Sequence, residues 1–281
     1  MARFNPLPLP ALSFSREESV PFITDDALAS SVGVYMGFSS RAGGVSEAPF
    51  DTLNLGSMVH DNSAAVAQNR ARVLAALNSE DAALVVPLQV HGTDIVEIPR
   101  QEDVAVAQKR AEKGADALLV QAPNACALLC FADCVPVIVV SPTGHFAVVH
   151  AGWRGAVAGI VGKAVRALAR ADAPLLECSE VQCCAQFNMY IGPCIHAECF
   201  EVSREVSAQF EQRFGASCLA DERHVDLPCA VSLDARAAGM VPERIADCGV
   251  CTMCNHEQFF SYRASNGTCG RHGAFALRKE A

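Results

Sequence analysis

The feature that most constrains the fold of this chain is a pair of apolar runs joined by a short turn. Residues 135–140 and 145–150 are rich in β-branched side chains, and a Ser-Pro-Thr-Gly segment lies between them at residues 141–144. Because proline presets one turn angle and glycine tolerates a positive φ, this pattern predicts an antiparallel β-hairpin. A hairpin centred on the turn would place Cys134 opposite His150, with their Cβ atoms about 5 Å apart. That distance suits a metal site or a Cys/His nucleophile pair, or two residues that merely meet, and a third partner is needed to decide.

The composition limits the class of protein. Apolar residues make up 51% of the 281, which is enough for a large core. The 22 basic and 31 acidic residues give a net charge of −9, which disfavours affinity for nucleic acid or for anionic membranes. No apolar run reaches the roughly 18–20 residues of a membrane span, and residues 1–10 lack a secretory signal pattern. We therefore expect a cytoplasmic protein whose 14 cysteines are mainly reduced thiols.

Strand and helix patterns interleave along the chain. Strands are predicted at residues 33–39, 83–91, 116–120, 125–131 and 181–191, and helices at residues 64–77, 156–171 and 198–214. Since at least one strand pair is an antiparallel hairpin, we expect an α+β fold of mixed β-sheets with helices packed on the outer faces. Residues 1–32, Pro-rich and then acidic, are predicted to be a loosely anchored lead-in, and residues 33–281 a single domain.

Two segments combine an arginine with glycines in a way that suits an anion. Arg41 precedes Gly43 and Gly44, whose backbone N–H groups can approach an anion, although a glycine turn beside a solvated arginine is the simpler alternative. Arg154 lies between a predicted strand and a predicted helix, an arrangement that also binds anions. There the alternative is that the glycines serve close packing and Arg154 pairs with an acid.

The C-terminal part is rich in residues that bind metals. Two overlapping C-x-x-C pairs are followed by further Cys and His residues; the set is Cys248, Cys251, Cys254, His256, Cys269 and His272. Their chemistry permits a structural zinc site, but the later spacing does not match a zinc ribbon. Ordinary loop thiols are the alternative, so a second metal at this place stays open.

A series of short sequence blocks occurs in a defined order from Gly37 to Leu277. They are residues 37–46 (GFSSRAGGVS), 53–56 (LNLG), 69–70 (NR), 89–92 (QVHG), 115–117 (ADA), 132–136 (ADCVP), 150–155 (HAGWRG), 191–193 (IGP), 260–263 (FSYR) and 270–271 (GR). In this order they resemble the bacterial laccase-domain family, whose members are named multicopper polyphenol oxidases, purine nucleoside phosphorylases or peptidoglycan editing factors. One departure is that Ala264 follows Arg263, where the family often has a second arginine.

The resemblance implies a catalytic metal site in a single laccase-type domain. Its ligands fall on His91, Cys134 and His150, which supplies the third partner that the hairpin lacked. Three N/S ligands suit Zn²⁺ and leave one position open for water or substrate. Copper is disfavoured because a multicopper site needs more converging histidines than the eight scattered here. Gln89 and Asp133 are candidates for orienting the ligands.

The resemblance also implies activity on purine nucleosides. The expected reactions are phosphorolysis of adenosine, inosine and methylthioadenosine and hydrolytic deamination of adenosine, for which zinc would lower the pKa of a bound water. Arg41 with Gly43 and Gly44 is our first choice for binding phosphate, and Arg154 is the second. The expected partners are the nucleoside and phosphate, with no nucleic acid, membrane or protein partner predicted.

Three other functions stay open. The first is a hydrolase that removes wrongly incorporated serine from peptidoglycan precursors, and the second is a copper-dependent polyphenol oxidase (laccase). The third is a non-enzymatic zinc or thiol module with a closed site built on Cys251 and Cys254. In that case Cys134 would be dispensable.

Overall fold

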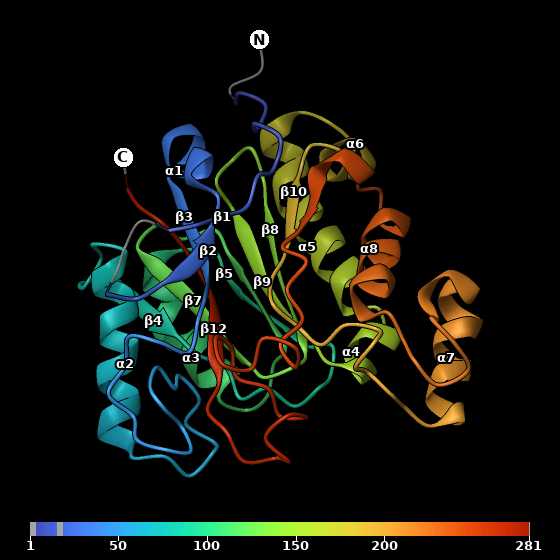
Figure 1. The fold of residues 1–281 in the computed structure, drawn as a ribbon. Coiled ribbons are helices and arrows are strands. Elements are labelled where there is room, and N and C mark those ends of the chain that lie inside the picture. The colour runs from blue at the N-terminus through green and yellow to red at the C-terminus, as the bar shows by residue number, and fades with distance from the viewer. Residues whose placement is uncertain (1–3, 16–18, 281) are drawn as a thin grey trace.

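The computed structural model describes residues 4–15 and 19–280, and within these ranges two six-stranded sheets lie face to face at the centre of the fold (Figure 1). Helices cover the outer faces of the pair. Each sheet mixes parallel and antiparallel pairs; β4 and β7 are parallel, for example, whereas β7 and β12 are antiparallel. The predicted α+β fold, a single domain of mixed sheets with outer helices, is confirmed.

The first sheet gathers strands from both ends of the chain. In spatial order it contains β1 (Ser13–Phe14), β2 (Phe22–Thr24), β3 (Val34–Ser39), β12 (His272–Arg278), β7 (Ala125–Phe131) and β4 (Ala83–Val85). The second sheet contains β11 (Ile245–Asp247), β10 (Asn188–Ile191), β8 (Val135–Val140), β9 (Phe146–Ala151), β6 (Ala117–Val120) and β5 (Ile95–Ile98). The chain passes between the two sheets after β4, after β6, after β7 and after β11.

The helices found in the described residues are α1 (Asp26–Val32), α2 (Ser63–Ala76), α3 (Val104–Ala111), α4 (Trp153–Val157), α5 (Ile160–Leu176), α6 (Glu180–Cys184), α7 (Arg204–Phe214) and α8 (Leu227–Ala237). Short 3₁₀ turns occur at Gln101–Asp103, Ala216–Cys218 and Pro242–Arg244. Among the helices described, none is both long enough and apolar enough to span a bilayer.

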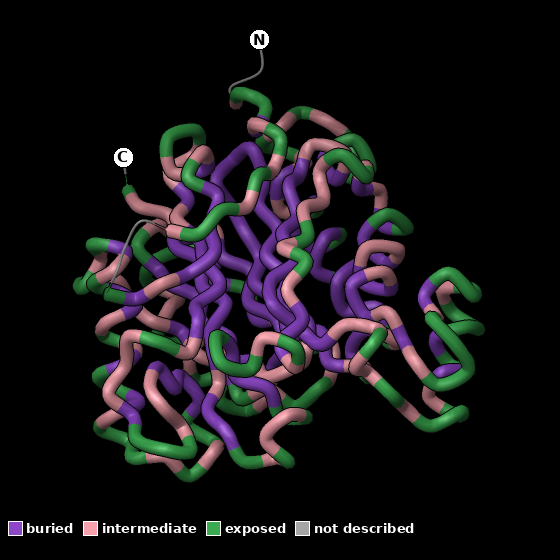
Figure 2. The backbone as a smooth tube through the Cα atoms, viewed as in Figure 1, coloured by how far each residue is buried: buried purple, intermediate pink, exposed green. Residues whose placement is uncertain are grey.

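Strand alternation explains the layering. In β8, Val137 and Val139 pack with α5 and α8, whereas Ile138 and Val140 face the first sheet. Both faces of β8 are therefore buried, which is why its sequence is apolar throughout (Figure 2). On the far side of the molecule, α2 packs Val73 and Leu74 against the first sheet.

Several predictions about the chain differ from the structure. The strand predicted at residues 83–91 ends at Val85. Residues 20–32 of the predicted lead-in supply β2 and α1, with Ile23 and Leu28 buried, because β2 pairs with β3; residues 1–3 and 16–18 lie outside the described residues. Residues 180–184 are helical rather than extended, since Ser179 and Gln182 form a capping box. The helix expected at residues 198–214 begins only at Arg204.

The predicted hairpin forms, but its register is shifted by two residues. Pro136, not Cys134, lies directly opposite His150. The reason is the turn, which runs from Ser141 to His145 and is closed by a hydrogen bond from the Ser141 N–H to the His145 carbonyl at 2.9 Å. Cys134 consequently lies just before β8, diagonally placed from His150.

Candidate metal centre and cavity

The three predicted ligands meet at one end of the sandwich. His91 follows β4, Cys134 precedes β8 and His150 belongs to β9, and their donor atoms all lie within 4.8 Å of one another. The Cys134 Sγ is 3.8 Å from the His91 Nε2. The two imidazole rings meet edge to face, with centroids 4.9 Å apart. His150 is buried and His91 is exposed, so the cluster is reachable from one side.

Asp116, which no sequence pattern marked as a site residue, holds two of the predicted ligands in place. Its buried carboxylate accepts a hydrogen bond from the His150 Nδ1 at 2.8 Å. It also accepts from the backbone N–H groups of His91 and Gly92, at 2.9 and 2.6 Å. These bonds fix the loop that carries His91 and leave the Nε2 of His150 for a metal. A carboxylate that orients a ligating histidine is the usual outer partner in zinc sites.

The charges of the cluster favour a thiolate. Burial alone would raise the pKa of the Cys134 thiol, but the positive charge of His150 and hydrogen bonds from both histidines outweigh it and lower the pKa to about 6. Burial likewise opposes a charge on His150, yet Cys134 and Asp116 together raise the pKa of His150 to about 9. A thiolate is the form of cysteine that binds metals.

A glycine makes the approach of the three ligands possible. A Cβ atom at Gly152 would lie 2.7 Å from the His91 Cδ2 and 3.2 Å from the Cys134 Sγ. Any side chain at this position would push His91 away from Cys134. The glycine after His-Ala in the sequence therefore allows these three side chains to approach one another.

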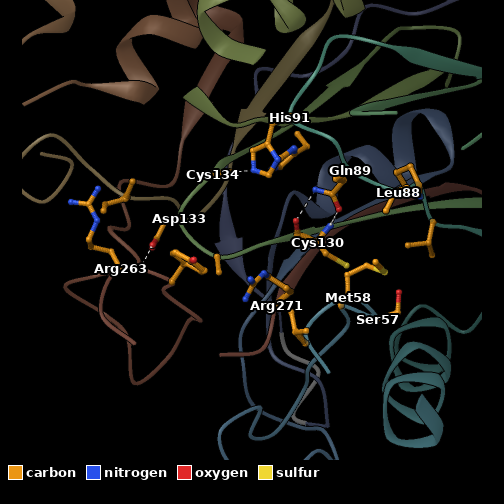
Figure 3. Close-up of a pocket in the computed structure, with 18 of the residues that line it drawn as sticks. Ser57, Met58, Leu88, Gln89, His91, Cys130, Asp133, Cys134, Arg263 and Arg271 are labelled. Carbon is orange, nitrogen blue, oxygen red and sulfur yellow. Dashed lines mark hydrogen bonds between the residues drawn. The ribbon is translucent and has the colours of Figure 1, made fainter. Parts of the chain in front are cut away.

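Gln89 and Asp133, predicted to orient the ligands, have other partners. Both oxygen and nitrogen of the Gln89 amide bond to the backbone of Cys130, each at 2.8 Å (Figure 3). The Asp133 carboxylate accepts hydrogen bonds from the Thr252 hydroxyl at 2.6 Å and from the backbone N–H of Arg263 at 2.7 Å. Both side chains shape the loops beside the ligands, and any effect of theirs on the metal stays a prediction.

The cluster opens into a cavity of about 590 Å³. Figure 3 shows His91 and Cys134 together on one side of it, with Arg271 across from them. Apolar side chains that are unusually exposed, Met58, Leu88 and Tyr262, also line the cavity. The size falls within the range of small-molecule sites, typically about 300–1,000 Å³.

Arginines supply the cationic part of the cavity wall. They are Arg70, Arg263 and Arg271, and within the described ranges none of the three forms an ion pair with a carboxylate. The Arg70 Nε and Nη2 donate to the Leu55 carbonyl, and the Arg271 Nη1 donates to the carbonyls of Cys269 and Gly270. Each guanidinium is thus anchored by backbone and keeps further donors for an anion.

Comparison with known proteins places the chain in a family. Residues 35–279 match the family model described as multi-copper polyphenol oxidoreductase laccase. The chain belongs to this laccase family. The predicted resemblance is therefore confirmed.

Relatives that resemble this laccase-family chain over most of its length are named purine nucleoside phosphorylases. YlmD of Geobacillus stearothermophilus is 33% identical over 258 residues, covering 88% of this chain and 91% of the relative. YfiH of Escherichia coli (strain K12) is 33% identical over 252 residues, covering 86% and 93%. The crystal structure of YlmD from Geobacillus stearothermophilus superposes with a TM-score of 0.81 at 29% identity, covering 96% of this chain and all 100% of that one.

The anion segments predicted in this laccase-family chain lie outside the cavity lining. The Arg41 guanidinium pairs with Asp51 at 3.2 Å, donates to the His256 carbonyl and stacks on Phe260. Gly44 donates its N–H to the Thr52 hydroxyl, and Gly43 has a φ of +92° that suits glycine. Arg154 is exposed and lies over the Trp153 ring. Their phosphate role stays a prediction, with no cavity contact to support it.

The sequence did carry signals for the residues it left without a role. Asp116, Arg70 and Arg271 all stand in blocks shared with the laccase family. Asp116 is also an acid that directly precedes an apolar strand, where burial requires a partner. What the sequence lacks is the pairing of β6 with β9, which brings Asp116 to His150.

Proposed function

We propose that this protein is a zinc-dependent purine nucleoside phosphorylase that acts on adenosine, inosine and methylthioadenosine and also deaminates adenosine. One observation carries the proposal: a His/Cys/His cluster that could hold a metal lines the same cavity as three arginines, none of which pairs with a carboxylate of the described residues. A nucleoside and phosphate need both an apolar wall and a cationic one. The names of the relatives point to the same reaction.

The donor set supports zinc. One thiolate and two imidazoles are ligands that zinc prefers, and three protein ligands leave a position open. In the described part of the chain, metal-binding side chains gather in two places, around His91 and around Cys251. These two clusters together contain only two histidines, which is too few for a multicopper centre. When bound, zinc supplies Lewis-acid polarisation of a substrate atom.

The other residues have roles that follow from their positions. Arg70 and Arg271 would hold phosphate through their remaining N–H groups, because guanidinium donors match phosphate oxygens. Met58, Leu88 and Tyr262 would cover the faces of the purine and exclude water. In phosphorolysis an oxygen of hydrogen phosphate bonds to C1′ of the ribose while the bond from C1′ to the purine nitrogen breaks, and the base leaves with the proton that the phosphate gives up.

The test measures metal content together with release of the free base from each nucleoside, with and without phosphate. We expect zinc, base release that requires phosphate, and loss of turnover in Cys134→Ala, with about one zinc ion fewer per chain. Cys229→Ala is the matched control because this half-buried thiol lies on α8. Base release without phosphate would instead identify a hydrolase, and bound copper without nucleoside turnover would favour the oxidase.

A further inference from the structure

A second cluster of metal-binding side chains shares no member with the three ligands described above. It contains Glu198, Cys199, Cys251 and Cys254, whose donor atoms all lie within 4.8 Å of one another. The Cys199 Sγ is 3.5 Å from the Cys254 Sγ, and the Cys254 Sγ is 4.0 Å from the Glu198 Oε1. Cys251 is buried, whereas Glu198 and Cys254 are exposed.

Backbone hydrogen bonds hold these side chains in place without help from a metal. The backbones of Cys251 and Cys194 form an isolated parallel β-bridge, and both thiols are free. The Thr252 N–H donates a hydrogen bond to the Cys194 carbonyl at 2.9 Å. The turn after Cys251 is closed by Asn255, whose N–H and side-chain amide both donate to the Cys251 carbonyl, at 3.0 and 2.8 Å. A separate turn at residues 196–199 presents Cys199, with its N–H bonded to the His196 carbonyl at 3.0 Å.

We propose that this cluster is a second, structural zinc site with three cysteine ligands and one glutamate. Cysteine thiolates and a carboxylate are ligands that zinc accepts, and four protein ligands close the coordination shell. The cluster thus differs from the three-ligand site, where a position stays open. The geometry selects among the C-terminal cysteines: Cys251 and Cys254 belong to the cluster, whereas Cys248 and Cys269 do not.

The second site would join two loops that form one wall of the cavity. Cys199 is followed by Phe200, and the loop that bears Cys251 and Cys254 continues to Arg263; both Phe200 and Arg263 line the cavity. The Arg263 Nη1 also donates to the Cys199 carbonyl at 3.4 Å. The backbone bridge between Cys194 and Cys251 already joins the two loops at one point, and a zinc ion would add a second link through Cys199 and Cys254. A structural zinc would therefore fix the shape of this wall.

The test is the zinc content of the full chain, purified under reducing conditions and dialysed into metal-free buffer. We expect about two zinc ions per chain in the wild type, and about one each in Cys134→Ala and in Cys254→Ser. Serine at the exposed position 254 leaves the core untouched. Cys248→Ser is the matched control, since it belongs to the other C-x-x-C pair and should keep the wild-type content.

A second variant tests the site in case Cys254→Ser fails to fold. Glu198→Gln changes one exposed ligand and keeps every thiol, so we expect it to fold and to release zinc to a chelator at least about 10-fold faster than the wild type. Zinc content in Cys254→Ser equal to that of the wild type would overturn the proposal. A disulfide between Cys199 and Cys254 in the reduced preparation would also overturn the proposal. It would be detected by mass spectrometry as the loss of two hydrogen atoms relative to the fully reduced chain. Zinc content is measured independently of nucleoside turnover. Failure of the second zinc site can therefore be told apart from failure of the proposed phosphorylase function.

Discussion

Replacing Asp116 by asparagine is the sharpest test of how the metal site is held. The carboxylate is fully buried and joins the His150 ring to the backbone of residues 90–92. Asparagine keeps the shape but has one acceptor oxygen and no charge, so it cannot satisfy all of these donors. His150 would lose the partner that fixes its orientation, and the His91 loop would lose part of its anchor.

The expected magnitudes follow from the contacts. Loss of an outer partner of a ligating histidine typically costs about 10- to 100-fold in metal affinity, or about 1.4–2.7 kcal/mol. Buried donors left without an acceptor, together with the lost charge-assisted bonds, should lower the free energy of unfolding by about 3 kcal/mol. Zinc affinity is measured by competition with a chromophoric chelator, and stability by urea unfolding.

Asp172→Asn is the matched control. Asp172 is equally buried and accepts from the His145 Nδ1 at 2.5 Å, at the turn end of the β8–β9 hairpin, opposite to the metal cluster. This variant should lose stability and keep its zinc affinity. Unchanged zinc affinity in Asp116→Asn would refute the orienting role, and equal losses of affinity in both variants would mean that general destabilisation explains the effect.

Two more predictions concern the cavity and the core. Arg271→Ala should raise the KM for phosphate by about 10-fold or more, because a charge-assisted contact is lost, while zinc content stays unchanged; a KM equal to the wild-type value would remove Arg271 from the phosphate site. His272 is fully buried, and burial lowers its pKa to about 3, whereas an unfolded chain would have a pKa near 6.5. Between about pH 6.5 and pH 3 the His272 ring is protonated in the unfolded chain but neutral in the folded one. His272 therefore leaves the free energy of unfolding unchanged above pH 6.5 and lowers it progressively as the pH falls towards 3. Relative to His272→Phe, the wild type should lose about 1.4 kcal/mol more per pH unit between about pH 6 and pH 5 in urea unfolding, and parallel curves would contradict this.

Much of the fold and the central site could be predicted because local patterns determine them. The apolar runs and the turn around residues 141–144 indicated the β8–β9 hairpin, and shared motifs indicated His91, Cys134 and His150. The hairpin register was off by two residues because the length of a turn depends on side-chain and backbone bonds that a sequence does not display. Such a shift keeps each side chain on its face, so the ligands still meet.

Other parts depend on long-range pairing and could not be predicted. Gln89 and Asp133 were the two candidates for orienting the ligands, and the Asp133 carboxylate bonds to Thr252 and Arg263. The pairing of β6 with β9 brings Asp116, which was not among the candidates, to His150. Cys199 was expected within a helix, and only the folded chain brings it to Cys251.

The central position of β12 has a consequence for the order of assembly. β12 is the last strand of the fold along the chain, yet it lies between β3 and β7 and pairs with both. During synthesis, β3 and β7 must therefore wait with open edges until residues 272–278 have emerged, and such edges favour pairing with other chains. Arg271, which directly precedes β12, reaches the cavity in the same event. A nascent chain cannot have a complete cavity before its first sheet is closed.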